Sequence, residues 1–208
     1  MPINIETNLP TFEQLPSAYL VSLNHYSAIA LCGEEKSKYL QGQVTCDVTT
    51  STEHSLLVGA HCNAKGKVFS AFRLINRNSA HLLIQPKASI NASITELKKF
   101  GVFAKVEISE TDKLSFFALV GENAPSILQN SFTRIPDSLN PVVQSGSTTL
   151  IYIAGKQARY ILIDTAETLE GVLVDMNLPV YNNAVWDLLE ISEGFDESLP
   201  DDFWLGDE

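Results

Sequence analysis

The sequence has few cysteines: Cys32, Cys46 and Cys62 are the only three, and none of them stands in a CxxC pair. An odd count without that spacing argues against a disulfide framework. The three thiols either meet in space as ligands of a metal or cluster, or are small buried residues of strands. We expect the second arrangement and no metal site, because short-spaced motifs such as HExxH are absent as well.

Long apolar runs are also missing from the 208 residues. No stretch of 18 consecutive apolar residues occurs, and the amino terminus lacks a charged segment followed by an apolar one. Membrane-spanning helices and secretory signal peptides need such stretches. We therefore expect a cytoplasmic protein without a membrane span.

The phosphate-binding and nucleophile motifs of common enzyme classes do not occur either. The sequence contains no GxxxxGK[ST], GxGxxG or GxSxG motif, although it has four histidines. Their absence disfavours nucleotide-dependent enzymes and serine hydrolases. His61 and Cys62 stand next to each other at a strand end, where strand alternation predicts that they point to opposite faces. His61 is either part of a site or a buried structural residue.

The negative charge is concentrated near the carboxyl end. The net charge is −11, and nine of the 25 acidic residues lie from position 187 onward, where no lysine or arginine occurs. The other 186 residues contain 16 acidic and 14 basic side chains. Because the body of the chain is nearly neutral and shows no basic stripe, we expect no direct binding of nucleic acid.

A hairpin followed by a helix occurs twice. The alternating patterns and helical spacings predict strands at 68–76 and 80–85 with a helix at 88–100, then strands at 148–154 and 159–164 with a helix at 165–175. Reuse of one unit predicts an α+β fold of two related halves, each an antiparallel sheet covered by helices. We place these halves at about 19–110 and 111–195, after an amino-terminal arm at 1–18 and before an acidic tail at 196–208.

A polar turn at 63–67 joins two further strands, at 55–62 and 68–76. Gly66 suits the positive φ that a tight hairpin turn needs. Lys65 and Lys67 on this turn are candidate contacts for an anion, or simply two solvated lysines of a hairpin tip.

Two aromatic residues are candidates for stacking on a flat ligand. Tyr26 begins a strand at 26–32 whose same-face residues are small, and Trp186 lies at the edge of a helix at 183–192. Aromatic rings stack on planar heterocycles at centroid separations of about 4.5 to 7 Å. Ordinary core packing accounts for each residue equally well when it is taken alone.

Four segments together resemble the YgfZ family of folate-binding tRNA-modifying proteins. These segments read KYLQGQVTCDV at 38–48, AHCNAKGK at 60–67, ELKKFGVFAKV at 96–106 and WDLLEISEGF at 186–195. The family is related to the glycine-cleavage aminomethyltransferases (GcvT, or T-protein). The resemblance extends from about Tyr19 to Phe195.

The resemblance implies a GcvT-like folate-binding core built from ferredoxin-like α+β repeats. It implies a tetrahydrofolate derivative as cofactor and a cytoplasmic role in tRNA modification (methylthiolation), through maintenance of iron–sulfur enzymes that act as partners. Trp186 matches a tryptophan that the family associates with folate, and Tyr26 stands where the family has another tryptophan. Lys65 and Lys67 are our assignments for the anionic glutamate tail of folate.

Two departures from the family patterns bear on activity. The aminomethyltransferases carry a catalytic aspartate shortly after the turn at 65–67, where this chain reads VFSAFR at 68–73. Without that carboxylate we do not expect one-carbon transfer, although a genuine aminomethyltransferase is one alternative. The YgfZ cysteine signature KGCYxGQE would lie beyond Phe195 and does not occur, as expected of a fragment or a shortened homologue. A second alternative is an interaction scaffold that does not bind folate and contacts a partner through the acidic tail.

Overall fold

The computed structural model describes residues 3–63 and 65–192 as two compact units. Unit 1 contains residues 1–24, 115–139 and 143–208, and unit 2 contains residues 25–114 and 140–142. The tail at 196–208 lies outside the described residues, as do the first two residues of the arm. Each unit combines antiparallel strand pairs with helices, which confirms the predicted α+β class.

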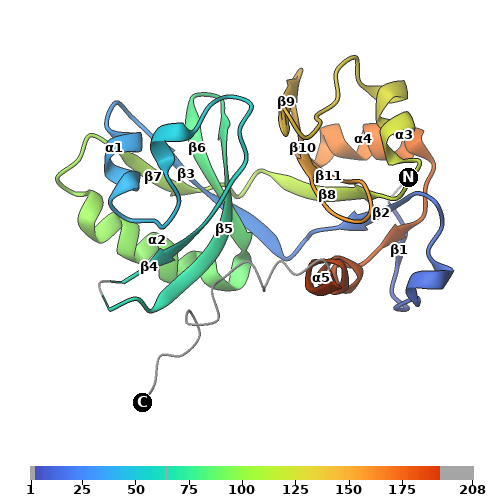
Figure 1. The fold of residues 1–208 in the computed structure, drawn as a ribbon, viewed down its shortest axis with the longest axis horizontal. Helices are drawn as coiled ribbons and strands as arrows, with labels where there is room; N and C mark the ends of the chain where they lie inside the picture. The colour runs from blue at the N-terminus through green and yellow to red at the C-terminus, as the bar shows by residue number, and fades with distance from the viewer. Residues whose placement is uncertain (1–2, 64, 193–208) are drawn as a thin grey trace. The chain divides into compact units, whose positions relative to one another are not determined.

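Unit 2 is built on a five-stranded sheet with the order β4-β5-β6-β3-β7 (Figure 1). All of its pairings are antiparallel. The strands are β3 (Tyr26–Cys32), β4 (Leu57–Cys62), β5 (Val68–Arg77), β6 (Ala80–Pro86) and β7 (Glu107–Glu110). The expected hairpins around 63–67 and 77–79 are therefore both present.

One face of this sheet is covered by α1 (Lys36–Gln41), η2 (Val48–Thr50) and α2 (Lys87–Gly101). Ile29 and Leu31 point to this face and form a core with Leu97 of α2. Tyr26 and Ala28 occupy alternate positions of β3 and therefore lie on the opposite face. This is the division of small and large residues that the alternation along 26–32 predicts.

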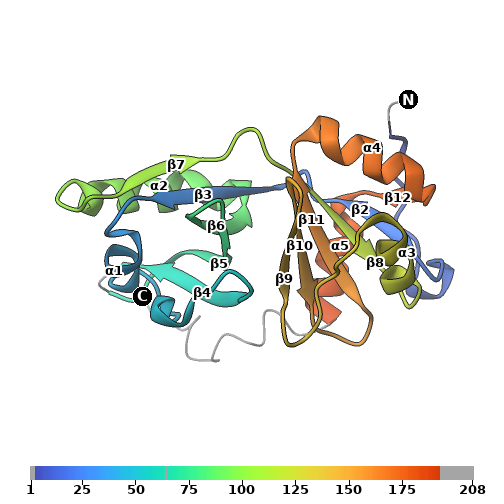
Figure 2. The ribbon, with the colours of Figure 1, turned by 90° about the horizontal axis from the view of Figure 1, so that it is seen from above.

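Unit 1 is built on a seven-stranded sheet with the order β1-β12-β2-β8-β11-β10-β9 (Figure 2). The strands are β1 (Ile5–Glu6), β2 (Tyr19–Ser22), β8 (Ser115–Val120), β9 (Val142–Ser145), β10 (Thr148–Ile153), β11 (Arg159–Asp164) and β12 (Val180–Tyr181). The short strand β12 pairs in parallel with both β1 and β2. Part of the amino-terminal arm is therefore hydrogen-bonded into a sheet, after which it forms the short helix η1 (Phe12–Gln14).

The two faces of the seven-stranded sheet carry different helices, as Figure 1 shows. The helices α3 (Ala124–Ser131) and α4 (Ala166–Met176) cover the face on which Tyr160 and Leu162 of β11 form a core with Leu128 and Leu169. The helix α5 (Asn183–Ser192) lies on the opposite face. Its Glu190 pairs with Arg159, which precedes Tyr160 on β11 and therefore points to the other side of the sheet. The strand β2 lies in this sheet, although its sequence position is next to β3 of unit 2.

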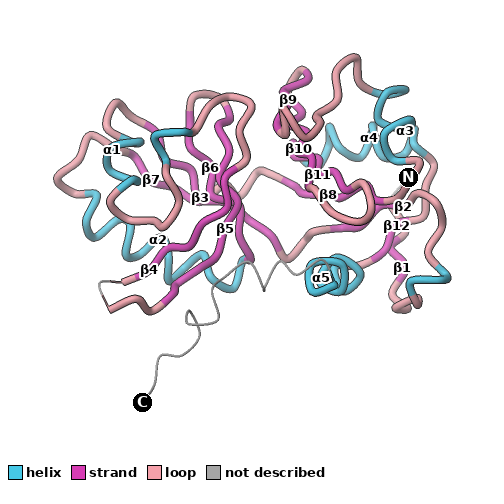
Figure 3. The backbone as a smooth tube through the Cα atoms, viewed as in Figure 1, coloured by secondary structure: helices cyan, strands magenta, loops and turns pink. Residues whose placement is uncertain are grey.

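The residue types at 102–108 predict a further strand, but the observed strand is displaced toward the carboxyl end. Residues 102–106 form a bend that α2 leads into, and β7 begins only at Glu107 (Figure 3). The amide of Val106 donates a hydrogen bond to the carbonyl of Ala104, which closes this bend. Val102 and Phe103 are consequently 75% and 95% exposed. Apolar residue type alone was the reason for the wrong assignment.

Within the described part of the chain, no helix combines the length and the hydropathy that crossing a membrane requires. The same residues contain no group of three or more His, Cys, Asp or Glu side chains placed to hold a metal ion.

Two glycines of unit 1 provide a matched test of its backbone. Gly121 has a φ of +122°, and a Cβ there would collide with the carbonyl oxygen of Ser17, whereas a Cβ on Gly171 of α4 would meet no atom within 4 Å. We expect Gly121→Ala to lower the free energy of unfolding by about 1–3 kcal/mol or more. Gly171→Ala should raise it by about 0.5–1 kcal/mol, because alanine favours the helix.

Urea denaturation of both variants measures these changes. Wild-type stability in Gly121→Ala would contradict the described backbone of unit 1.

Candidate functional site

The turn between β4 and β5 is held by its own asparagine. Asn63 Oδ1 accepts hydrogen bonds from the amides of Lys65 and Lys67, each at 2.9 Å, and Gly66 has a φ of +81°. The backbone N–H of Asn63 also donates a hydrogen bond to the backbone carbonyl of Lys67, at 2.9 Å. These bonds define the turn backbone, so the two lysine side chains project from a fixed base.

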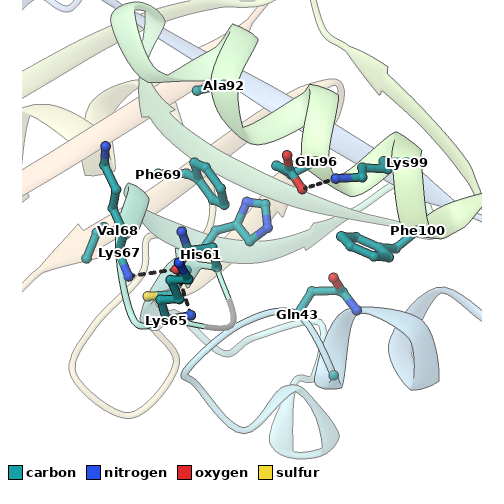
Figure 4. Close-up of a pocket in the computed structure, with 13 residues that line it drawn as sticks. Gln43, His61, Lys65, Lys67, Val68, Phe69, Ala92, Glu96, Lys99 and Phe100 are labelled. Carbon is teal, nitrogen blue, oxygen red and sulfur yellow. Dashed lines mark hydrogen bonds and ion pairs between the residues drawn. The ribbon is translucent and has the colours of Figure 1, made fainter.

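A pocket of about 960 Å³ lies beside this hairpin in unit 2. Its lining comes from the hairpin, from α2 and from the end of α1: Gly42, Gln43, His61, Cys62, Asn63, Lys65, Lys67, Val68, Phe69, Ala92, Glu96, Lys99 and Phe100. The structure thus brings Lys65 and Lys67, the two candidate anion contacts, to one pocket. Figure 4 shows how the labelled side chains surround it.

His61 is the most buried titratable group of the pocket, with 2% of its surface exposed. Its Nδ1 lies 2.9 Å from the hydroxyl oxygen of Ser93 on α2, and its ring centroid lies 5.1 Å from that of Phe69. Burial lowers the pKa of His61, while the negative charge of Glu96 raises it by a smaller amount. The imidazole is therefore neutral near pH 7 and offers a hydrogen-bonding atom rather than a charge.

Cys62 lines the same pocket as His61, which differs from the alternation that we expected. The pairing of β4 with β5 shifts its register between these two residues, so strict alternation does not apply there. Burial raises the pKa of the Cys62 thiol, which keeps it protonated. A protonated thiol is a poor nucleophile, so the arrangement favours binding over chemistry at this position.

The α2 side of the pocket carries residues that the sequence analysis missed. Glu96, Lys99 and Phe100 lie on one side of α2, and Lys99 pairs with Glu96 at 3.7 Å. The Lys99 ammonium also lies 5.2 Å from the Phe100 ring centroid. The helical spacing of these residues indicated that they share a face of α2. No sequence pattern indicated that this face packs against the hairpin.

Tyr26 lies outside this pocket, on the opposite face of the same sheet. It is 9% exposed, and its ring meets that of His25 edge to face, with centroids 4.5 Å apart. Tyr26 pairs with Pro86 of β6, and the next residue along, Ser27, faces the side covered by α2. A ligand that stacks on Tyr26 would therefore not fill the pocket described above.

Trp186 is fully buried on α5 of unit 1. The Arg159 guanidinium lies 5.3 Å from its ring centroid and donates a hydrogen bond to Glu190 at 2.7 Å. Arg159 also donates to the carbonyl of Ala154 at 3.1 Å. The indole is thus fixed by a buried charge pair, which is an environment that tolerates little change in ring position.

Comparison with characterised proteins identifies relatives of this chain. No family model matches it. The tRNA-modifying protein YgfZ of Colwellia psychrerythraea is 58% identical over 195 residues, which cover 94% of this chain and 60% of that protein. The YgfZ protein of Vibrio atlanticus is 35% identical over 179 residues, which cover 86% and 53%. The chain spans little more than half the length of such relatives, and the resemblance to the YgfZ family is confirmed.

The fold also resembles a solved aminomethyltransferase. The crystal structure of the glycine cleavage system aminomethyltransferase T from Bartonella henselae matches with a TM-score of 0.69 and 16% identity. The match covers 86% of this chain and 51% of that chain. This likeness confirms the expected GcvT-like fold.

The environment of His61 leads to a testable pKa. We expect its pKa to lie below the usual 6.5 and to fall further in Glu96→Gln, because that variant removes the charge that favours the imidazolium. Since the unfolded chain binds the proton more readily, the free energy of unfolding contributed by His61 should decrease as the pH falls below about 6.5.

NMR titration of the imidazole Cε1–H resonance measures both pKa values. A wild-type pKa at or above 6.5, or a higher pKa in Glu96→Gln, would refute this description of the site.

Proposed function

We propose that this chain, as a homologue of the tRNA-modifying YgfZ proteins, forms a folate-binding module that acts in tRNA modification. The observation that carries this proposal is the 58% identity to a YgfZ protein over 94% of the chain. The GcvT-like fold supports it, since the resemblance associates that fold with tetrahydrofolate derivatives. The proposed setting is the cytoplasm, and the proposed role is the maintenance of iron–sulfur enzymes that methylthiolate tRNA.

We propose Tyr26 and Trp186 as separate candidate contacts for the flat pterin, and Lys65 and Lys67 as candidate contacts for the anionic glutamate tail. Tyr26 is 9% exposed and Trp186 is fully buried, so a ligand would reach the Trp186 ring only after the side chains that cover it move. The lysines are exposed on the hairpin tip, where long side chains can reach an anion. The role is binding rather than catalysis, because the segment at 68–73 has no carboxylate.

Burial decides which substitution tests Trp186. Replacement by alanine would leave a cavity in unit 1 and cost about 3–5 kcal/mol of stability, which would obscure any effect on binding. Trp186→Phe keeps an aromatic ring, and Trp204→Phe makes the same chemical change at the other tryptophan of the chain. The second variant is therefore the matched control.

Isothermal titration calorimetry of the protein with folinic acid should show saturable binding. We expect Trp186→Phe to weaken it about 3- to 10-fold, the range expected for a reduced aromatic contact. Trp204→Phe should bind like the wild type, and circular dichroism should show that both variants are folded. Absence of saturable heat in the wild type would overturn the folate proposal, and wild-type affinity in Trp186→Phe would remove Trp186 from the site.

A further inference from the structure

The pocket beside the β4–β5 hairpin is lined by a hydrogen-bonding atom that no described residue binds. His61 binds Ser93 through Nδ1, and its Nε2 has no hydrogen-bond partner among the described residues. Figure 4 shows the His61 ring directed into the space between Phe69, Glu96 and Phe100. Because Nε2 borders the pocket and is not bound by the described part of the protein, it is available to a polar atom of a ligand.

The walls of the pocket suit a flat ring. Phe69 and Phe100 both line it, and the Phe69 ring already packs against that of His61 at 5.1 Å. Phe100 is 53% exposed, which leaves its ring open to further contact. A volume of about 960 Å³ is enough for a molecule of one or two rings with substituents.

The charge of the pocket favours an anion. Its lining includes three lysines, Lys65, Lys67 and Lys99, and one acidic residue, Glu96. The neutral state of His61 leaves this balance positive, in a chain whose net charge is −11. A local positive field within an acidic protein selects for a carboxylate or phosphate group at this position.

We propose that this pocket is a ligand site of its own, for a small molecule that combines an aromatic ring with a carboxylate or phosphate. The ring lies against Phe69 and Phe100, the acidic group faces the lysines, and a polar atom of the ligand binds His61 Nε2. The site is separate from Tyr26, which lies on the other face of the sheet. It shares Lys65 and Lys67 with the proposed folate contacts, but it does not depend on whether the chain binds folate through Trp186.

Two probes represent this chemistry: 4-aminobenzoylglutamate, an aromatic carboxylate, and adenosine 5′-monophosphate, an aromatic phosphate. Calorimetric titration of the full chain with each probe should show saturable binding for at least one. Binding of the first alone assigns the pocket to aromatic carboxylates, and binding of the second alone assigns it to aromatic phosphates. Failure of both probes to saturate at millimolar concentration would overturn the proposal.

Matched variants on α2 and the adjoining bend locate the bound probe. Phe100→Ala should weaken binding about 5- to 50-fold through the loss of stacking, whereas Phe103→Ala removes a more exposed ring from outside the pocket and should have no effect. Lys99→Gln should weaken binding about 2- to 5-fold, and Lys98→Gln should not.

Equal losses in Phe100→Ala and Phe103→Ala would also overturn the proposal, because binding would then not depend on the pocket. The exposed positions of both rings make unfolding of either variant an improbable cause, and circular dichroism checks it. Since none of the four substitutions changes Tyr26 or Trp186, failure here leaves the folate proposal to its own test.

Discussion

A buried charge must be paired, and this constraint fixes the position of α5 on the sheet of unit 1. Arg159 of β11 and Glu190 of α5 have side chains only 3% and 10% exposed, and their atoms lie 2.7 Å apart. Removal of either partner would leave the other charge buried and uncompensated, at a cost of about 3–5 kcal/mol. The pair therefore determines how α5 packs, and with it the place of Trp186, whose ring lies 5.3 Å from the guanidinium. The folate proposal depends on this arrangement.

Unit 2 buries hydrogen-bonded neutral groups on one face of its sheet. Beneath α2, the covered face of its sheet carries Ser70 and Gln85, which are hydrogen-bonded to each other at 3.1 Å, as well as His61 bonded to Ser93. These bonds satisfy polar side chains that apolar packing alone would leave without partners. The imidazole Nε2 is left over at the point where this layer reaches the hairpin tip, and that is where the pocket lies. The Nε2 of His61, which no described residue binds, thus borders the pocket.

The parts of this fold that could be predicted from the sequence are those that have a local residue pattern. Strict alternation gave β3 its bounds and its two faces, and helical spacing indicated α2 and α5. Strands of two residues, β1 and β12, have no such pattern, and the pairing of β2 with β8 joins positions about a hundred residues apart. The pocket was missed for the same reason, since it forms only when α2 packs on the hairpin. The signal for Lys65 and Lys67 was local, because Asn and Gly define the turn that presents them.

We propose that folate contacts Trp186, whose ring lies beside the Arg159–Glu190 pair. The most direct measurement is the ¹⁹F NMR spectrum of protein labelled with 5-fluorotryptophan. The Trp186 resonance is assigned as the one that is absent from the spectrum of the labelled Trp186→Phe variant. On addition of folinic acid, the account predicts that this resonance shifts and saturates at the same ligand concentration as the heat of binding. An unshifted Trp186 resonance in protein that is saturated with folinic acid would contradict it.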